Sequence, residues 1–110
     1  MSRTAIVTFE AEKTKQAYES LRQGKFEEQQ LHTAISKAIT ALKTNPASGT
    51  KIPKRLWPKE YAKYEITNLW KYDLPDGARL IYTIYTDETT IASAIIEWFG
   101  HKEYEKRFNY

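Results

Sequence analysis

The sequence contains no cysteine, and it has only four glycines and four prolines among its 110 residues. Without cysteine there can be no disulfide framework, no thiolate metal site and no cysteine nucleophile. The few glycines form neither a phosphate-binding loop nor a nucleophile elbow. No apolar run approaches the roughly 20 residues that a membrane span requires, and the first residues lack the apolar stretch of a signal peptide. These absences predict a cytoplasmic protein with no membrane partner.

Apolar and aromatic residues are plentiful by comparison. They include eight Tyr, three Trp and four Phe, and hydrophobic residues make up 41% of the chain. That content is sufficient for one packed core, and the length suits one domain. No repeat, low-complexity tract or linker divides the sequence. We therefore expect a single domain over residues 1–110.

The first half of the chain predicts one strand and two helices. Residues 4–10 alternate loosely between apolar and polar and are typical of a strand. A polar helix is expected over residues 11–23, ended by Gly24. A second helix is expected over Phe26–Thr44, because its apolar residues recur at spacings of three and four. These residues are Leu31, Ala34, Ile35, Ala38, Ile39 and Leu42.

The second half predicts three consecutive strands over residues 69–74, 79–86 and 90–99. The connections between them are short enough for antiparallel hairpins. Residues 101–110 are expected to be a charged tail. The predicted fold class is therefore α+β, with an N-terminal strand, a two-helix hairpin and a three-stranded antiparallel meander that form one sheet with the helices on one face.

Positive charge is concentrated in residues 51–63. The whole chain carries a formal charge of +3, whereas this segment holds five Lys or Arg residues against the single Glu60. Trp57, Tyr61 and Tyr64 lie among or beside these cations. Cations for phosphates and flat rings for unstacked bases are what single-stranded RNA requires. A solvated loop whose aromatic side chains pack onto the core explains the same pattern equally well.

Three side chains in the second half are candidates for chemistry. Lys71 and Arg79 belong to neighbouring predicted strands, and the register decides whether they share a face and form a phosphate-binding surface. Either cation could instead pair with Asp73 on a solvated face. His101 follows the last strand, where an imidazole could exchange a proton near neutral pH, or could be an ordinary surface residue. The two histidines match no metal-ligand spacing, so we expect no metal and no cofactor.

Two segments resemble motifs of one protein family. The pair WKYDL and ARLIYTI is similar to the "Y-K-L … Y-R-(L/V)-(I/V)-Y-x-I" signature of the RelE/ParE superfamily, the toxins of bacterial and archaeal toxin–antitoxin systems. The later segment GHKEY is similar to the endings of RelE- and HigB-like members. Asp73 departs from the pattern, because the best-studied RelE type has a second lysine there. The helical hairpin agrees in order, so the resemblance covers nearly the whole chain.

The resemblance implies a ribosome-dependent mRNA endoribonuclease toxin, or mRNA interferase, that inhibits translation. Members of the RelE kind need no metal: the 2′-OH of the mRNA attacks the adjacent phosphate and leaves a 2′,3′-cyclic end. This chemistry requires a base for the 2′-OH, cations for the charge on the phosphate, and an acid or cation for the leaving oxygen. The implied partners are a cognate antitoxin protein, the ribosome and mRNA, without a cofactor.

Carried over by position, the resemblance implies catalytic roles for Lys71, Arg79, His101 and Tyr104. Arg79 would stabilise the phosphate, and His101 and Tyr104 would act in proton transfer or base stacking. Five further cations would bind RNA, namely Lys51, Lys54, Arg55, Lys102 and Arg107.

Two other functions remain open. The chain could be a non-catalytic or gyrase-targeting binding module on the same scaffold, as ParE-type members are. In that case alanine at His101 or Arg79 would leave its activity intact. It could also be a general RNA-binding protein that acts through residues 51–63 alone, with binding that depends steeply on salt.

Overall fold

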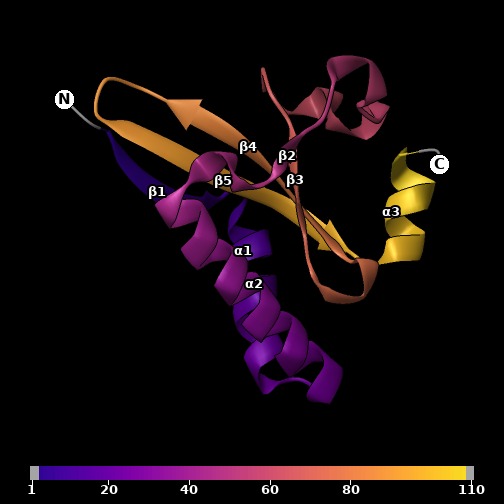
Figure 1. Ribbon diagram of the computed structural model, residues 1–110. Helices are drawn as coiled ribbons and strands as arrows, with labels where there is room; N and C mark the ends of the chain where they lie inside the picture. The colour runs from indigo at the N-terminus through magenta and orange to yellow at the C-terminus, as the bar shows by residue number, and fades with distance from the viewer. Residues whose placement is uncertain (1–2, 109–110) are drawn as a thin grey trace.

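The computed structural model describes residues 3–108 as an α+β fold with one sheet (Figure 1). The strands are β1 (Thr4–Phe9), β2 (Thr50–Lys51), β3 (Trp70–Asp73), β4 (Arg79–Thr86) and β5 (Thr90–Phe99). The helices are α1 (Glu12–Ser20), α2 (Phe26–Thr44) and α3 (His101–Phe108). Short 3₁₀ turns join several of them, at Leu21–Gln23, Pro46–Ser48, Lys54–Leu56, Lys59–Lys63 and Pro75–Gly77.

The sheet is mixed and has the strand order β1-β5-β4-β3-β2. The antiparallel meander of β3, β4 and β5 is confirmed, whereas the prediction of four strands is wrong because β2 adds a fifth. β1 pairs with β5 in parallel. The two residues of β2 are too few to show a periodic pattern, and they pair with the free edge of β3. This non-local pairing is not encoded in local sequence.

The helical hairpin differs from the prediction only in its first helix. α2 has the predicted bounds, but α1 ends at Ser20 and continues as the 3₁₀ turn Leu21–Gln23. Gly24 follows in an extended conformation, and a β-carbon on it would lie 2.6 Å from the side chain of Glu28. Because Gly24 has no β-carbon, the Glu28 side chain has room beside it. The Glu28 carboxylate accepts a hydrogen bond from the backbone N–H of Lys25 at 2.9 Å, which satisfies a donor at the start of α2.

One hydrophobic core lies between α2 and the sheet, and we refer to it as the α2-side core. From α2 it takes three fully buried residues at helical spacing, Ile35, Ala38 and Leu42. From the sheet and the turn after β3 it takes Leu74, Leu80, Tyr82 and Ile95. Alternation along β4 directs Leu80 and Tyr82 to this face. The apolar stripe predicted for α2 is therefore the stripe that is buried.

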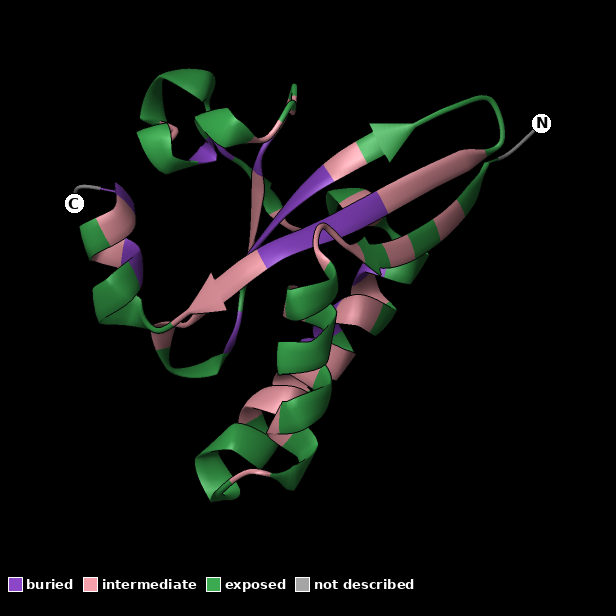
Figure 2. Cartoon of the chain, turned by 180° about the vertical axis from the view of Figure 1, so that it is seen from behind, coloured by how far each residue is buried: buried purple, intermediate pink, exposed green. Residues whose placement is uncertain are grey.

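A second core covers the opposite face of the sheet. The two predicted helices do share one face, but the prediction missed the helix α3, which lies on the other. We refer to the second core as the α3-side core, and its buried residues are Ile52, Tyr61, Leu69, Ile81, Ile96, Tyr104 and Phe108. Figures 1 and 2 show α3 and the 3₁₀ turns Lys54–Leu56 and Lys59–Lys63 on the side away from α1 and α2. The predicted tail is a helix over its described part because Tyr104 and Phe108, four residues apart, bury one side of it; residues 109–110 lie outside the described part.

A β-bulge allows β5 to serve both cores. Ile81 pairs with Glu97, whereas the next residue, Tyr82, pairs with Ile95, so Ile96 is an extra residue in β5. Ile96 and Glu97 consequently both face the α3 side. Trp98, which strict alternation would place with Ile96, packs against the α2-side core instead.

Candidate functional site

The register of β3 against β4 places three charged side chains on the α3 side of the sheet. Asp73 pairs directly with Arg79, and Lys71 pairs with Ile81, a residue of the α3-side core. Directly paired residues lie on the same face, as do residues two apart in one strand. The tight turn Pro75–Gly77 fixes this register. Lys71 and Arg79 therefore share a face, and so does Asp73.

Tyr104 of α3 lies against both cations. Its ring centroid is 5.4 Å from Lys71 Nζ and 5.0 Å from Arg79 Cζ. The side chain also packs on Phe108, with 4.7 Å between ring centroids, and on Phe99, with 6.0 Å. Tyr104 is only 2% exposed. The ring is therefore part of the α3-side core, and it stabilises both cations through the negative face of its π system.

Arg79 is held by several neighbours. Its Nε lies 3.0 Å from Asp73 Oδ1, and its NH1 group donates to the backbone oxygens of Gly77 at 2.6 Å and Ala78 at 3.2 Å. The Arg79 side chain is 18% exposed and that of Asp73 is 69% exposed. The guanidinium thus has a fixed orientation and a carboxylate that balances its charge. The sequence left two arrangements open, and the structure contains both. Lys71 and Arg79 share a face, and Arg79 pairs with Asp73.

His101 is the first residue of α3 and lies beside the β3–β4 turn. A β-carbon at Gly77 would approach the His101 β-carbon to 2.8 Å, and Gly77 has a φ of +78°, a conformation that favours glycine. His101 Nε2 lies 3.2 Å from a carboxylate oxygen of Glu105, one helical turn on, and the imidazole is 54% exposed. The turn whose backbone binds Arg79 is therefore the one that contacts His101.

Four of the five predicted RNA-binding cations are exposed, and the fifth is paired within the fold. Lys51 of β2, Lys54 and Arg55 of the 3₁₀ turn Lys54–Leu56, and Lys102 of α3 are exposed. Arg107 is engaged, because its NH1 donates to Glu97 at 2.7 Å. Its charge is therefore already balanced within the fold.

The aromatic side chains of the basic segment turn inward. Tyr61 is buried, and Trp57 and Tyr64 pack against the α3-side core. The Trp57 indole N–H donates to the backbone oxygen of Ile52 at 2.9 Å. The structure therefore agrees with the loop whose rings pack onto the core. Lys54 Nζ lies over the Trp57 ring, 5.9 Å from its centroid.

Sequence reasoning missed the role of Glu97, which anchors α3 and the basic segment to the sheet. It accepts hydrogen bonds from the Tyr61 hydroxyl and from Arg107, and Arg107 Nε lies 3.8 Å from Glu60. Burial, followed by the Glu97 carboxylate, raises the pKa of Tyr61. Burial opposes the charged form of Arg107, but Glu97, Tyr61 and Glu60 together outweigh it and raise the pKa of Arg107. The signal available was a lone carboxylate in the otherwise uncharged strand TIASAIIEWF.

Residues 3–108 contain no group of three or more His, Asp or Glu side chains placed to hold a metal ion. Within the same part of the chain, none of the helices is both long and apolar enough to cross a bilayer. Comparison with models of protein families, with curated proteins and with solved structures found no match to this chain.

Proposed function

We propose that this chain is a ribosome-dependent mRNA endoribonuclease toxin of a toxin–antitoxin system, which acts in the cytoplasm without a metal. One observation carries the proposal: Lys71 and Arg79 from adjacent strands converge on Tyr104, and His101 lies beside Gly77, whose backbone oxygen accepts a hydrogen bond from Arg79. These are the four side chains that the resemblance to RelE-like toxins singles out. They come from three different elements, and only the folded chain brings them together.

The arrangement fits a cleavage in which RNA supplies its own nucleophile. His101 takes the proton of the 2′-OH, whose oxygen then bonds to the adjacent phosphorus while the bond from phosphorus to the 5′-oxygen breaks. Lys71 and Arg79 stabilise the negative charge on the phosphate oxygens. The leaving 5′-oxygen takes a proton from water, and His101 returns its proton to the solvent. The products are a 2′,3′-cyclic phosphate and a 5′-OH.

Burial narrows the role of Tyr104 in this mechanism. A hydroxyl carried by a side chain that is 2% exposed is poorly placed to exchange protons with RNA. Its ring, in contrast, holds both cations at fixed positions. We therefore assign proton transfer to the exposed His101 and treat Tyr104 as a positioning residue.

The proposal is tested by incubating the protein with ribosomes programmed with a defined mRNA and mapping new 5′ ends. Cleavage is expected only with ribosomes, and His101→Ala and Lys71→Ala should each reduce its rate by at least about 100-fold. The matched controls are His32→Ala, which removes the other histidine, and Lys106→Ala, which removes an exposed lysine of α3. An active His101→Ala variant, or a folded wild-type protein that leaves mRNA intact, would refute the mechanism.

A second candidate is a ParE-like binding module that acts without catalysis. It is favoured by the cover that Tyr104 forms over Lys71 and Arg79, and by a groove of about 710 Å³ between α2 and the end of β3. Its lining includes the apolar residues Leu31 and Leu74 and the acidic residues Glu27, Asp73 and Asp76. A toxin of this kind would inhibit DNA supercoiling by gyrase. Supercoiling inhibited equally by the wild type and His101→Ala would support it.

A further inference from the structure

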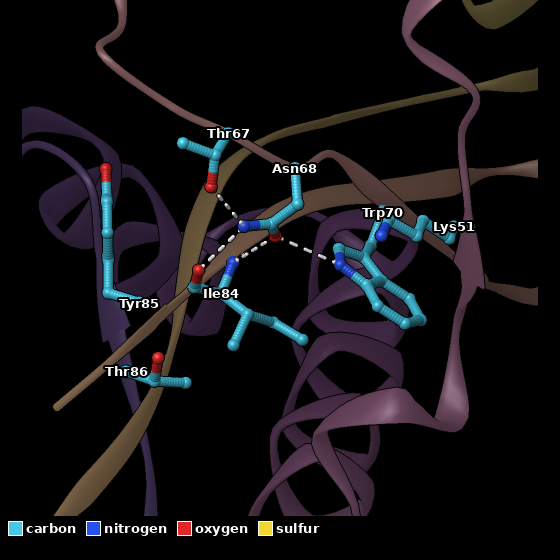
Figure 3. Close-up of a pocket in the computed structure, with 7 residues that line it drawn as sticks. All are labelled: Lys51, Thr67, Asn68, Trp70, Ile84, Tyr85 and Thr86. Carbon is cyan, nitrogen blue, oxygen red and sulfur yellow. Dashed lines mark hydrogen bonds between the residues drawn. The ribbon is translucent and has the colours of Figure 1, made fainter. Parts of the chain in front are cut away.

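The sheet has a notch where β4 extends beyond the start of β3 (Figure 3). β3 begins at Trp70, which pairs with Tyr82, so within the described residues the last part of β4 has no strand beside it on this edge. The notch has a volume of about 500 Å³, a size typical of small-ligand sites. Its lining residues are Lys51, Thr67, Asn68, Trp70, Ile84, Tyr85 and Thr86.

The Asn68 side chain replaces the missing strand at one position. Its Oδ1 accepts from the backbone N–H of Ile84 at 2.8 Å, and its Nδ2 donates to the Ile84 carbonyl at 2.8 Å. Oδ1 also accepts from the Trp70 indole N–H at 3.0 Å, as the dashed lines in Figure 3 show. Because its N–H is fixed in this way, the indole ring has one orientation in the notch.

Trp70 therefore provides a rigid aromatic surface beside a cation. One side of the indole packs on Tyr82, with 6.0 Å between ring centroids and 23° between planes. Lys51 is the direct cross-strand partner of Trp70, so the two side chains lie on the same face. Lys51 is exposed and forms no ion pair within residues 3–108. A charged group of a ligand can therefore pair with it.

We infer that this notch binds one unpaired nucleobase of a single-stranded RNA, with the base on Trp70 and its phosphate at Lys51. A base requires a flat apolar partner and polar groups at its edge, and its phosphate requires a cation. The notch supplies the ring of Trp70, the hydroxyls of Thr67 and Thr86, and the ammonium group of Lys51. The Thr86 backbone turns to the same side as that of Ile84, two residues before it, and adds a donor and an acceptor.

The notch and the candidate catalytic site lie on opposite faces of the sheet. Trp70 and Tyr82 face the α2 side, whereas Lys71 and Arg79 face the α3 side. The inference rests on the proposed function for its choice of RNA, but it concerns a separate surface. An RNA strand that reaches both would pass over the short edge strand β2, with the notch fixing a base away from the cleaved bond.

The binding site is tested by NMR, because each of the three Trp indole N–H groups gives its own signal. The signal missing from the Trp70→Phe spectrum identifies Trp70. Addition of a five-nucleotide oligoadenylate to the wild type, without ribosomes, should shift this signal and leave that of Trp98 in place. An unmoved Trp70 signal at saturating oligonucleotide would overturn the inference. Binding of AMP without binding of the oligonucleotide would also overturn it, since the notch would then serve a free nucleotide.

Affinity measurements on variants separate the contribution of the Trp70 ring to oligoadenylate binding from that of the Lys51 charge. Trp70→Leu should weaken oligoadenylate binding at least about tenfold, and Trp70→Phe should weaken it less, because base stacking needs a ring. Lys51→Gln should weaken binding about threefold. It should also reduce the slope of log affinity against log salt concentration by about the amount expected for one lost phosphate contact. Lys15→Gln removes an exposed lysine of α1 and should have no effect. Equal affinities for Lys51→Gln and Lys15→Gln would contradict the assignment of Lys51.

Failure of this inference is distinguishable from failure of the proposed function. If ribosomal cleavage occurs and does not depend on Trp70 or Lys51, and the indole signal does not move, only the notch is refuted. If no cleavage occurs but the oligonucleotide still shifts the Trp70 signal, the notch is supported and the endoribonuclease is refuted.

Discussion

The α2-side core and the α3-side core lie on opposite faces of one sheet but are covered in different ways. The 19-residue helix α2 supplies the fully buried helical residues of the first, and α1 packs at its margin. An eight-residue helix and several 3₁₀ turns cover the second. Polar contacts of Glu97 with Tyr61 and Arg107 connect these pieces. All four candidate catalytic residues lie on or beside the second core.

Under the proposed function, the face covered by the long helix α2 supports the fold and the segmented face carries the chemistry. A short helix gains little from its own backbone and depends on its tertiary contacts. Segments with few contacts open with a lower free energy than the core of the sheet, and functional elements are commonly found among them. We therefore expect α3 to detach from the sheet without global unfolding.

The largest expected effect is on the α2-side core. Leu42→Ala should lower the free energy of unfolding by about 2–5 kcal/mol, because it leaves a cavity beneath a rigid helix. Denaturant unfolding followed by circular dichroism measures this loss. The same substitution at Leu56, which is 43% exposed, serves as the control and should change stability by about 0.5 kcal/mol or less. Equal losses at both positions would remove the basis for treating α2 as the stable cover.

An intermediate and local effect is expected on the α3 side. Glu97→Gln keeps an acceptor for the Tyr61 hydroxyl but removes the charge opposite Arg107, and it should cost about 1–3 kcal/mol. Hydrogen exchange of α3 amides should become faster while that of α2 amides is unchanged. Glu105→Gln removes a more exposed carboxylate and is the matched control. Equally faster exchange in α2 and α3 would show that the two covers open together.

The smallest expected effect is a loss of stability at high pH. It tests the burial of Tyr82, the β4 residue that packs in the α2-side core. Burial raises the pKa of Tyr82 to about 12, against about 10 in the unfolded chain. The unfolded state therefore loses its proton first, and stability falls as pH rises from 10 to about 12, by about 1 kcal/mol over the first pH unit. Tyr82→Phe should show a shallower pH dependence in urea unfolding. An identical slope in both proteins would mean that Tyr82 ionises as readily in the folded state as in the unfolded state.

The parts of the fold that follow from local pattern could be predicted from the sequence. α2 and the three antiparallel strands have the expected periodicity and short connections. β2 and the parallel pairing of β1 depend on partners distant in the chain. The helix α3 could not be predicted, because its sequence is mostly charged and its only apolar residues are Tyr104 and Phe108, four positions apart.

The candidate site was predictable to a similar extent. Alternation placed Lys71 and Asp73 on one face, and the short turn predicted a hairpin that could bring Arg79 beside them. The burial of Tyr104 could not be predicted, because it requires α3 to fold back onto the sheet. The hydrogen bond from Arg107 to Glu97 could not be predicted either, because the bulge at Ile96 decides on which face of the sheet Glu97 lies.

The hydrogen bonds of Asn68 also bear on how this sheet avoids aggregation. An unpaired strand edge is a template on which a strand of another molecule can add. By bonding both the N–H and the C=O of Ile84, the Asn68 carboxamide occupies that edge as a peptide group would. A side chain cannot be extended into a ladder, so sheet growth stops at this residue. Asn68 thus protects an interior strand of the fold that would otherwise be open to its neighbours in concentrated solution.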